Sequence, residues 1–418
     1  MIKNINHKLG VVSITGFMIL SFIIIAMRRP DVITAAQPWA EDGKVWLAGI
    51  YNDGFWNSII LPQNGYYQTI SRITYGIALL FGLSNAPLAA NIIAILIRCF
   101  FVGFILSDRM GFAPLKFRIS VAAYFILMPN ISEGFVNITN AHWYLSMYLM
   151  AVLMAKEPES PVGKVHDFIV LVVSGLSGPF VVFIVPCLII KRICLRGGII
   201  KAVRGINAFD VVMALCCIIQ IIAILKTSGA TRIDAPLGYS FGLLSDIISC
   251  RLIYGSFLPF YLAREMAVHG NVNIFLFIIL CAALFFSFLK YNWRIKCLIL
   301  FPVLMIGFAL KSPVIAFNQP QWPLIFNTEA GERYFYVTNV ALACLAVSLV
   351  SVIPKFRTVT LIVGLIIFAA IVPKHFRLPN LPESGYAQDI QAFNFKPKGE
   401  KVEIRILPPG WTMKLIKK

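Results

Sequence analysis

The sequence predicts an all-α polytopic membrane protein, a bundle of about nine transmembrane helices plus a re-entrant segment. Of its 418 residues, 59% are hydrophobic and 13% are charged, and its mean hydropathy is +0.80. A soluble domain needs more polar surface than this composition supplies. Apolar runs recur along the whole chain, and short basic segments connect them. Both features are typical of a helical membrane protein.

The apolar runs give the positions of the predicted spans. The first run, 10–27, follows a short basic start and lacks a small-residue cleavage site, so we expect a retained helix and not a signal peptide. The remaining predicted spans are 87–106, 117–130, 142–155, 211–226, 273–289, 297–310, 336–353 and 358–372. Residues 1–372 are therefore expected to form one transmembrane domain, followed by a tail at 373–418.

The distribution of basic residues predicts the orientation of the chain. Lysine and arginine occur in every short loop on one side, namely 107–116, 156–166, 191–210, 290–296 and 354–357. Basic loops of this kind stay in the cytoplasm, so the N-terminus is expected there and the tail on the far side. The same tendency explains much of the net charge of +18, and nucleic-acid binding is not expected.

Two further apolar stretches do not fit as simple spans. Residues 166–190 have basic flanks on both sides and a Ser-Gly-Leu-Ser-Gly-Pro break, which predicts a re-entrant pair of half-helices. Residues 66–83 contain Arg72 and several tyrosines, which predicts an interfacial helix. The far side then carries a long first loop at 28–86, the segments 227–272 and 311–335, and the tail, and chemistry is expected on this side.

The tail and the cysteines complete the fold prediction. Apolar and charged residues alternate at 401–406, as in a strand, before a turn at 408–410. A small β element is therefore expected in the tail. The nine cysteines are scattered without metal-ligand spacing, so neither a zinc site nor a disulfide framework is expected.

The first loop contains the most suggestive acidic residues. Glu41 and Asp42 follow Trp39 shortly after the first span, and several aromatic residues come next. A carboxylate near the membrane surface, beside rings that stack on sugars, suits a catalytic base. The alternatives are a helix cap and an ordinary aromatic belt.

A second, smaller loop at 131–141 is rich in groups that suit carbohydrate. Its candidate substrate-binding residues are Glu133, Asn137, Asn140, His142 and Trp143. Amides orient sugar hydroxyls and a ring stacks on the sugar face, yet helix capping and interfacial anchoring fit equally well. His142 is interpreted as a hydrogen-bonded interfacial residue, because no second His or Cys lies at ligand spacing.

Arg333 and Tyr334 lie where the chain re-enters the apolar region at 336–353. The planar guanidinium of arginine grips a phosphate better than lysine does, so Arg333 is a candidate phosphate ligand with Tyr334 as a substrate contact. A snorkelling anchor or a salt bridge to Glu332 is the competing interpretation.

With these residues, the chain resembles the GT-C glycosyltransferases. More narrowly, it resembles the phage-type serotype-converting O-antigen glucosyltransferases of Gram-negative bacteria. The resemblance rests on Ala40-Glu41-Asp42-Gly43 after the first span, on the predicted spans with a re-entrant segment between the fourth and fifth, and on the long first loop and the tail. It covers essentially the whole chain, through short motifs.

The resemblance implies an enzyme of the bacterial inner membrane with a periplasmic C-terminus. Such an enzyme moves a hexose, glucose in that family, from undecaprenyl phosphate to a lipid-linked O-antigen repeat of lipopolysaccharide on the periplasmic face. The acidic position of the family falls on Glu41, with Asp42 beside it. A sugar phosphate has a good leaving group, so one base and a cation suffice, and no metal or cofactor is required. The candidate phosphate contacts are Arg333, Arg232, Arg251 and Arg264.

Two other functions stay open from the sequence. An O-antigen polymerase would use arginines in large outer loops, but it would not need the carboxylate after the first span. A lipid-linked oligosaccharide transporter would place charged residues within its spans. The predicted spans are almost free of such residues, which favours the transferase.

Overall fold

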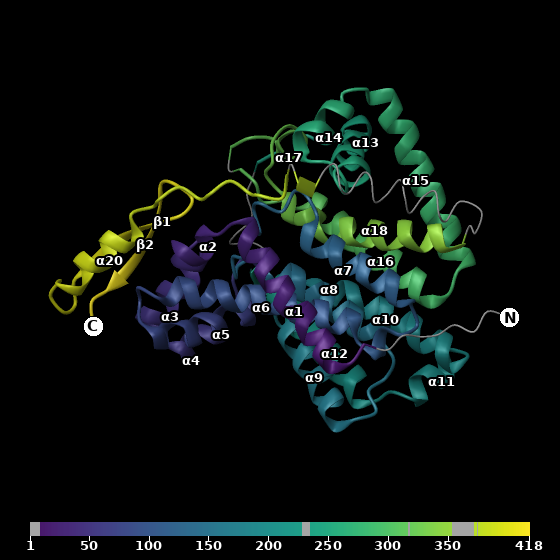
Figure 1. Ribbon diagram of the computed structural model, residues 1–418, viewed down its shortest axis with the longest axis horizontal. Helices are drawn as coiled ribbons and strands as arrows, with labels where there is room; N and C mark the ends of the chain where they lie inside the picture. Colours follow the sequence, from purple (N-terminus) through teal and green to yellow (C-terminus); the bar gives the residue numbers. More distant parts are fainter. Residues whose placement is uncertain (1–8, 228–234, 317, 353–371, 374) are drawn as a thin grey trace.

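The computed structural model describes residues 9–418 except 228–234, 317, 353–371 and 374. The chain forms a bundle of helices with one small two-stranded sheet in its tail (Figure 1). Within the described ranges, five helices are long and apolar enough to cross a membrane: α1 (Val11–Arg28), α6 (Ala86–Leu106), α12 (Ala208–Thr227), α15 (Gly270–Lys290) and α16 (Trp293–Lys311). The prediction of a helical membrane protein is confirmed at this level, whereas the count of nine spans stays a prediction.

Two other predicted spans form helices that are shorter than a bilayer requires, namely α7 (Leu115–Leu127) and α8 (Ala141–Met154). The predicted span 336–353 corresponds to α18 (Tyr336–Val352), which runs up to the edge of the described residues. A spanning helix needs about 20 residues. Pro114 and Pro129 flank α7, and the residue before a proline disfavours helical backbone, which explains its early end at Leu127. The predicted span 358–372 lies almost entirely outside the described residues, which include only its last position.

α8 is the centre of the bundle. Every residue of α8 from Ala141 to Leu153 is buried, and the helix packs against α6, α18, α9 (Pro161–Gly175) and α10 (Phe180–Arg196). α15 shows the opposite pattern, since Asn273 is its one buried residue. An apolar helix with so little of its surface covered by protein is suited to lipid.

The break predicted within 166–190 separates α9 from α10. Residues 176–179 join the two helices and contact the entry to α5 (Thr69–Ala78). The Gly178 N–H donates to Tyr67 O at 2.8 Å, and the Thr69 N–H donates to Leu176 O at 3.1 Å. Gly178 adopts φ +91, which favours glycine. The break is therefore fastened to the first loop, while re-entry from one side of a membrane stays a prediction.

Short helices fill the connections between the long ones. Their bounds are α2 (Asp31–Thr34), η1 (Asp42–Leu47), α3 (Ala48–Asp53), α4 (Phe55–Ile59), η2 (Leu79–Phe81), η3 (Asp108–Met110), α11 (Ile199–Arg204), α13 (Phe241–Ile248), η4 (Ser249–Tyr254), α14 (Phe260–Met266), α17 (Gln321–Asn327) and η5 (Glu332–Phe335). The predicted interfacial helix at 66–83 corresponds to α5 and η2.

The tail folds into a helix and a hairpin, which confirms the predicted β element. α20 (Tyr386–Asn394) packs on β1 (Lys401–Ile406), which pairs antiparallel with β2 (Trp411–Ile416). The tail lies beside the short helices of the first loop (Figure 1). The Asn52 side chain fastens the two together, because it donates to Lys414 O at 2.8 Å and accepts the Ile416 N–H at 2.9 Å.

Gly43 provides a test of this docking. A Cβ at Gly43 would lie 2.8 Å from Ile406 Cδ1 on one side and 3.0 Å from Pro38 Cβ on the other. Gly43→Ala should therefore overpack the joint, lower the stability by about 1–3 kcal/mol and expose the tail to limited proteolysis. Gly49→Ala is the matched control, because its Cβ would meet no atom closer than 3.7 Å. Equal proteolysis of both variants would contradict this account of the joint.

Candidate functional site

Asp42 ties the first loop to the second. It begins η1 and is buried. Its carboxylate accepts the Ile138 N–H at 3.2 Å, the Thr139 N–H at 2.8 Å and the Thr139 hydroxyl at 2.6 Å. The Trp46 indole donates to the same hydroxyl at 2.9 Å. Both oxygens of Asp42 are therefore committed to positioning the second loop, which leaves this residue poorly placed to act as a base.

Glu41 faces a different environment from its neighbour. It is half-buried, and its carboxylate makes no hydrogen bond or ion pair with any residue that the structure describes. It lies within electrostatic range of Arg333 and Tyr66. Glu41 is thus the member of the acidic pair whose oxygens remain available to a substrate.

The backbone before Glu41 is held in a strained conformation by the tail. Ala40 adopts φ 45, a left-handed conformation that is uncommon for a residue with a side chain. Its N–H donates to Leu407 O, and Trp39 forms a parallel bridge with Leu407. Strain of this kind persists only where the surroundings enforce it, and it concentrates at functional sites. The tail therefore fixes the backbone conformation just before Glu41 through the contacts of Leu407 with Trp39 and Ala40.

Arg333 pairs with Glu133, not with Glu332 as the competing interpretation had it. The two side chains form an ion pair, and the Glu133 carboxylate also accepts the Arg333 N–H at 3.2 Å. Glu332 in turn accepts the Glu133 N–H at 3.2 Å. The Arg333 guanidinium also donates to Val314 O at 2.8 Å and to the Tyr334 hydroxyl at 3.1 Å. These contacts, which we call the clasp, join the second loop to η5 beside Glu41.

Aromatic rings from three segments border this clasp. The Trp143 and Tyr334 rings meet edge to face with their centroids 5.8 Å apart. The His142 ring stacks on Phe180 at 5.5 Å and lies 6.2 Å from the Tyr66 ring. His142 is surrounded by rings, and within the described ranges no three His, Cys, Asp or Glu side chains gather as around a metal ion. We call Glu41, Tyr66, Glu133, Trp143, Arg333 and Tyr334 the Glu41 cluster.

The two asparagines of the second loop bond within that loop. Asn137 donates to Glu133 O at 2.8 Å, and its own oxygen accepts from the Asn140 side chain at 2.8 Å and from the Asn140 N–H at 3.1 Å. Both residues are buried. Their contacts shape the approach to α8, which supports the structural alternative for these residues over sugar binding.

The other candidate phosphate contacts do not join the Glu41 cluster. Arg251 is buried and donates to the carbonyls of Ile325, Thr328 and Ala330. Arg264 donates to Asn327 Oδ1 at 2.7 Å and lies over the Phe326 ring at 3.9 Å. Both arginines thus hold the segment that leads to η5. Arg232 lies outside the described residues.

The sequence pattern missed four features that border or support the site. Tyr66 is one of several aromatic residues in the first loop, and Phe180 is one of many apolar residues in the 166–190 stretch, so the pattern does not single out either residue. The break at 176–179 was recognised, but its contact with the first loop required the fold. Arg98, within the predicted span 87–106, is fully buried with none of its three nitrogens bonded to a described residue. The Tyr144 ring lies 4.7 Å from it.

Asp42 gives the stability of the chain a specific pH dependence. Burial raises the pKa of its carboxyl from 3.8 to about 7, although the hydrogen bonds from Thr139 and Ile138 offset part of this rise. A carboxyl with a raised pKa binds its proton more tightly in the folded state. Its contribution to stability is therefore complete below about pH 4 and is lost as the pH rises toward 7.

Asp42→Asn should therefore flatten the decline of the thermal unfolding midpoint between about pH 4 and pH 7. The measurement is the unfolding midpoint of purified protein across this range. Asp53→Asn removes an exposed carboxylate of the same loop and should leave the decline unchanged. An identical pH dependence in wild type and Asp42→Asn would contradict the assignment.

Comparisons with known proteins found no match for this chain. No protein-family model matches it, and neither does any curated protein or any solved structure. Support for a function comes from the Glu41 cluster and from the sequence resemblance.

Proposed function

We propose that the chain is a glycosyltransferase that moves a hexose from a polyprenyl phosphate to a lipid-linked acceptor sugar at the membrane surface. One observation carries the proposal: the Glu41 carboxylate has no partner among the described residues and lies within electrostatic range of the Arg333 guanidinium. A base and a cation are the two groups that this transfer needs. In the resemblance, the donor is undecaprenyl phosphate glucose and the acceptor is the O-antigen repeat on the periplasmic face of the bacterial inner membrane.

The chemistry follows from these two groups. Glu41 takes the proton of an acceptor hydroxyl, whose oxygen attacks the anomeric carbon of the donor. The bond from that carbon to the phosphate oxygen breaks, and the phosphate leaves with the electron pair. Positive charge at Arg333 stabilises the departing phosphate. The buried Trp143 and Tyr334 rings pack beside this pair of groups, and the Asp42 contacts with the second loop keep Glu41 near Arg333.

Arg333 retains donors for a phosphate. A guanidinium carries five N–H groups in a planar fork. The ion pair with Glu133 and the bonds to Val314 O and Tyr334 use three of them. The remaining N–H groups have no partner among the described residues, and a phosphate oxygen suits them.

Glu41→Gln should lower the rate of sugar transfer by about 10²- to 10⁴-fold, because glutamine keeps the shape of the side chain but cannot accept the proton. The assay follows labelled glucose from undecaprenyl phosphate glucose to O-antigen in membranes, with the protein level measured by immunoblot. Asp53→Asn is the control for a lost acidic charge in the first loop and should keep wild-type transfer. Normal transfer by Glu41→Gln would reject Glu41 as the base and leave Asp42 as the rival carboxylate of the first loop.

Arg333→Lys should lose at least about tenfold in kcat/KM for the donor, although it keeps the charge, because lysine lacks the planar fork. The same transfer assay, run over a series of donor concentrations, measures this loss. Arg264→Lys is the matched control and should transfer normally, since Arg264 contacts Phe326 and Asn327 instead of the Glu41 cluster. Wild-type kinetics in Arg333→Ala would reject Arg333 as the phosphate contact and move that role to Arg232 or Arg251.

A further inference from the structure

An apolar cavity of about 400 Å³ lies between α6, α7, α8, α16 and α18. Its walls are built mainly from aliphatic and aromatic side chains such as Phe101, Phe117, Met147, Leu298, Val340 and Ala341. This volume is within the range of ligand-binding cavities. Its lining is far too apolar for a small water-soluble ligand, so an occupant with a hydrocarbon part fits it.

The cavity has a polar end that lies far from the Glu41 cluster. Arg118 and Arg294 line this end. Arg294 donates to Met154 O at 3.0 Å, at the last residue of α8. His142 and Trp143, beside the Glu41 cluster, lie at the first turn of the same helix. At 1.5 Å per residue, the two ends of this 14-residue helix are about 20 Å apart.

The two arginines keep donors that no described residue accepts. Arg118 is 5% exposed, and its Nη1 donates to Leu106 O and Ser107 O, both at 2.7 Å, while its buried Nε has no partner. Among the described residues, the Arg294 guanidinium donates a hydrogen bond only through Nε, and it lies over the Phe112 ring at 4.3 Å and the Trp293 ring at 4.5 Å. Asp108 is within electrostatic range of Arg118.

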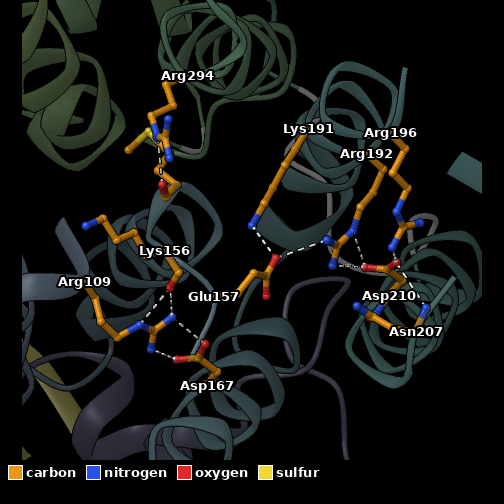
Figure 2. A network of polar contacts seen from close by, with 11 residues as sticks. Arg109, Lys156, Glu157, Asp167, Lys191, Arg192, Arg196, Asn207, Asp210 and Arg294 are labelled. Atoms are coloured by element: carbon orange, nitrogen blue, oxygen red, sulfur yellow. Dashed lines mark hydrogen bonds and ion pairs between the residues drawn. The ribbon is translucent and has the colours of Figure 1, made fainter. Parts of the chain in front are cut away.

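Acidic side chains near this end are already paired with other cations. Figure 2 shows Arg294 apart from these pairs; its Nε donates to Met154 O. The ion pairs join Arg109 to Asp167 at 2.5 Å, Lys191 and Arg192 to Glu157 at 3.1 Å, and Arg192 to Asp210 at 2.7 Å. The polar end of the cavity therefore carries the positive charges of Arg118 and Arg294, and neither arginine forms an ion pair with a carboxylate of the described residues.

We propose that this cavity binds one anionic phospholipid. One of its two acyl chains lies along the apolar walls, and its phosphate lies against Arg118 and Arg294. A buried guanidinium with an unused donor is costly in an apolar setting, and a phosphate oxygen supplies both the acceptor and the opposite charge. The site is separate from the proposed sugar transfer, because it lies at the other end of α8.

Native mass spectrometry of the full-length protein in detergent tests the proposal, with phosphatidylglycerol or phosphatidylethanolamine added. Wild type should retain one phosphatidylglycerol at concentrations where phosphatidylethanolamine is not retained. Arg294→Gln and Arg118→Gln/Arg294→Gln should bind phosphatidylglycerol at least about tenfold more weakly. Lys116→Gln removes the same charge from an exposed position two residues from Arg118 and should bind as wild type does.

Ala341→Phe is a second variant that keeps both arginines and fills the cavity. It should also lose the lipid, and a thermal melt of each variant shows that the fold is retained. Retention of phosphatidylglycerol by Ala341→Phe would place the lipid elsewhere and overturn the proposal. Equal binding of the two phospholipids, wild-type binding by Arg294→Gln, or replacement of the phospholipid by undecaprenyl phosphate would overturn it as well.

Discussion

The bonds between the buried Asp42 carboxylate and the backbone at Ile138 and Thr139 hold the candidate site together. Glu41 belongs to the first loop, whereas Arg333 is fastened by its ion pair to Glu133 of the second loop. The distance between Glu41 and Arg333 therefore depends on how the first loop packs against the second loop. The hydrogen bonds of Asp42 hold the two loops in this arrangement. A charge buried for positioning carries a desolvation cost that its hydrogen bonds only partly offset.

The second loop is short, yet it connects most of the elements around the site. Its backbone donates hydrogen bonds to Asp42 of the first loop, and its Glu133 binds Arg333 of η5. It then leads directly into α8, the most buried helix. Val136 in this loop adopts φ 63, which is an outlier for a β-branched residue. A rigid, strained connector at the start of a fully buried helix is a suitable platform for groups that must keep a fixed geometry.

Sequence patterns predicted the long helices well, because an uninterrupted apolar run has few alternatives in a bilayer. They predicted the hairpin of the tail from the alternation at 401–406. Hydropathy alone overestimates α7, because Pro114 and Pro129 bound the helix within the apolar run. The roles within the site were harder to predict. Glu41 and Asp42 are adjacent and chemically similar, and only their tertiary contacts distinguish an available carboxylate from a buried one. Arg251 likewise differs from Arg333 only in what it contacts.

The pairing of Ala40 with Leu407 joins nearly opposite ends of the described chain. During synthesis, the segment that contains Leu407 must be translated before it can hold the backbone next to Glu41. The tail must then reach the same side of the membrane as the first loop before that contact can form. A chain that stops short of Leu407 therefore lacks this support for Glu41, and chemistry that depends on the contact begins only after the segment with Leu407 is in place.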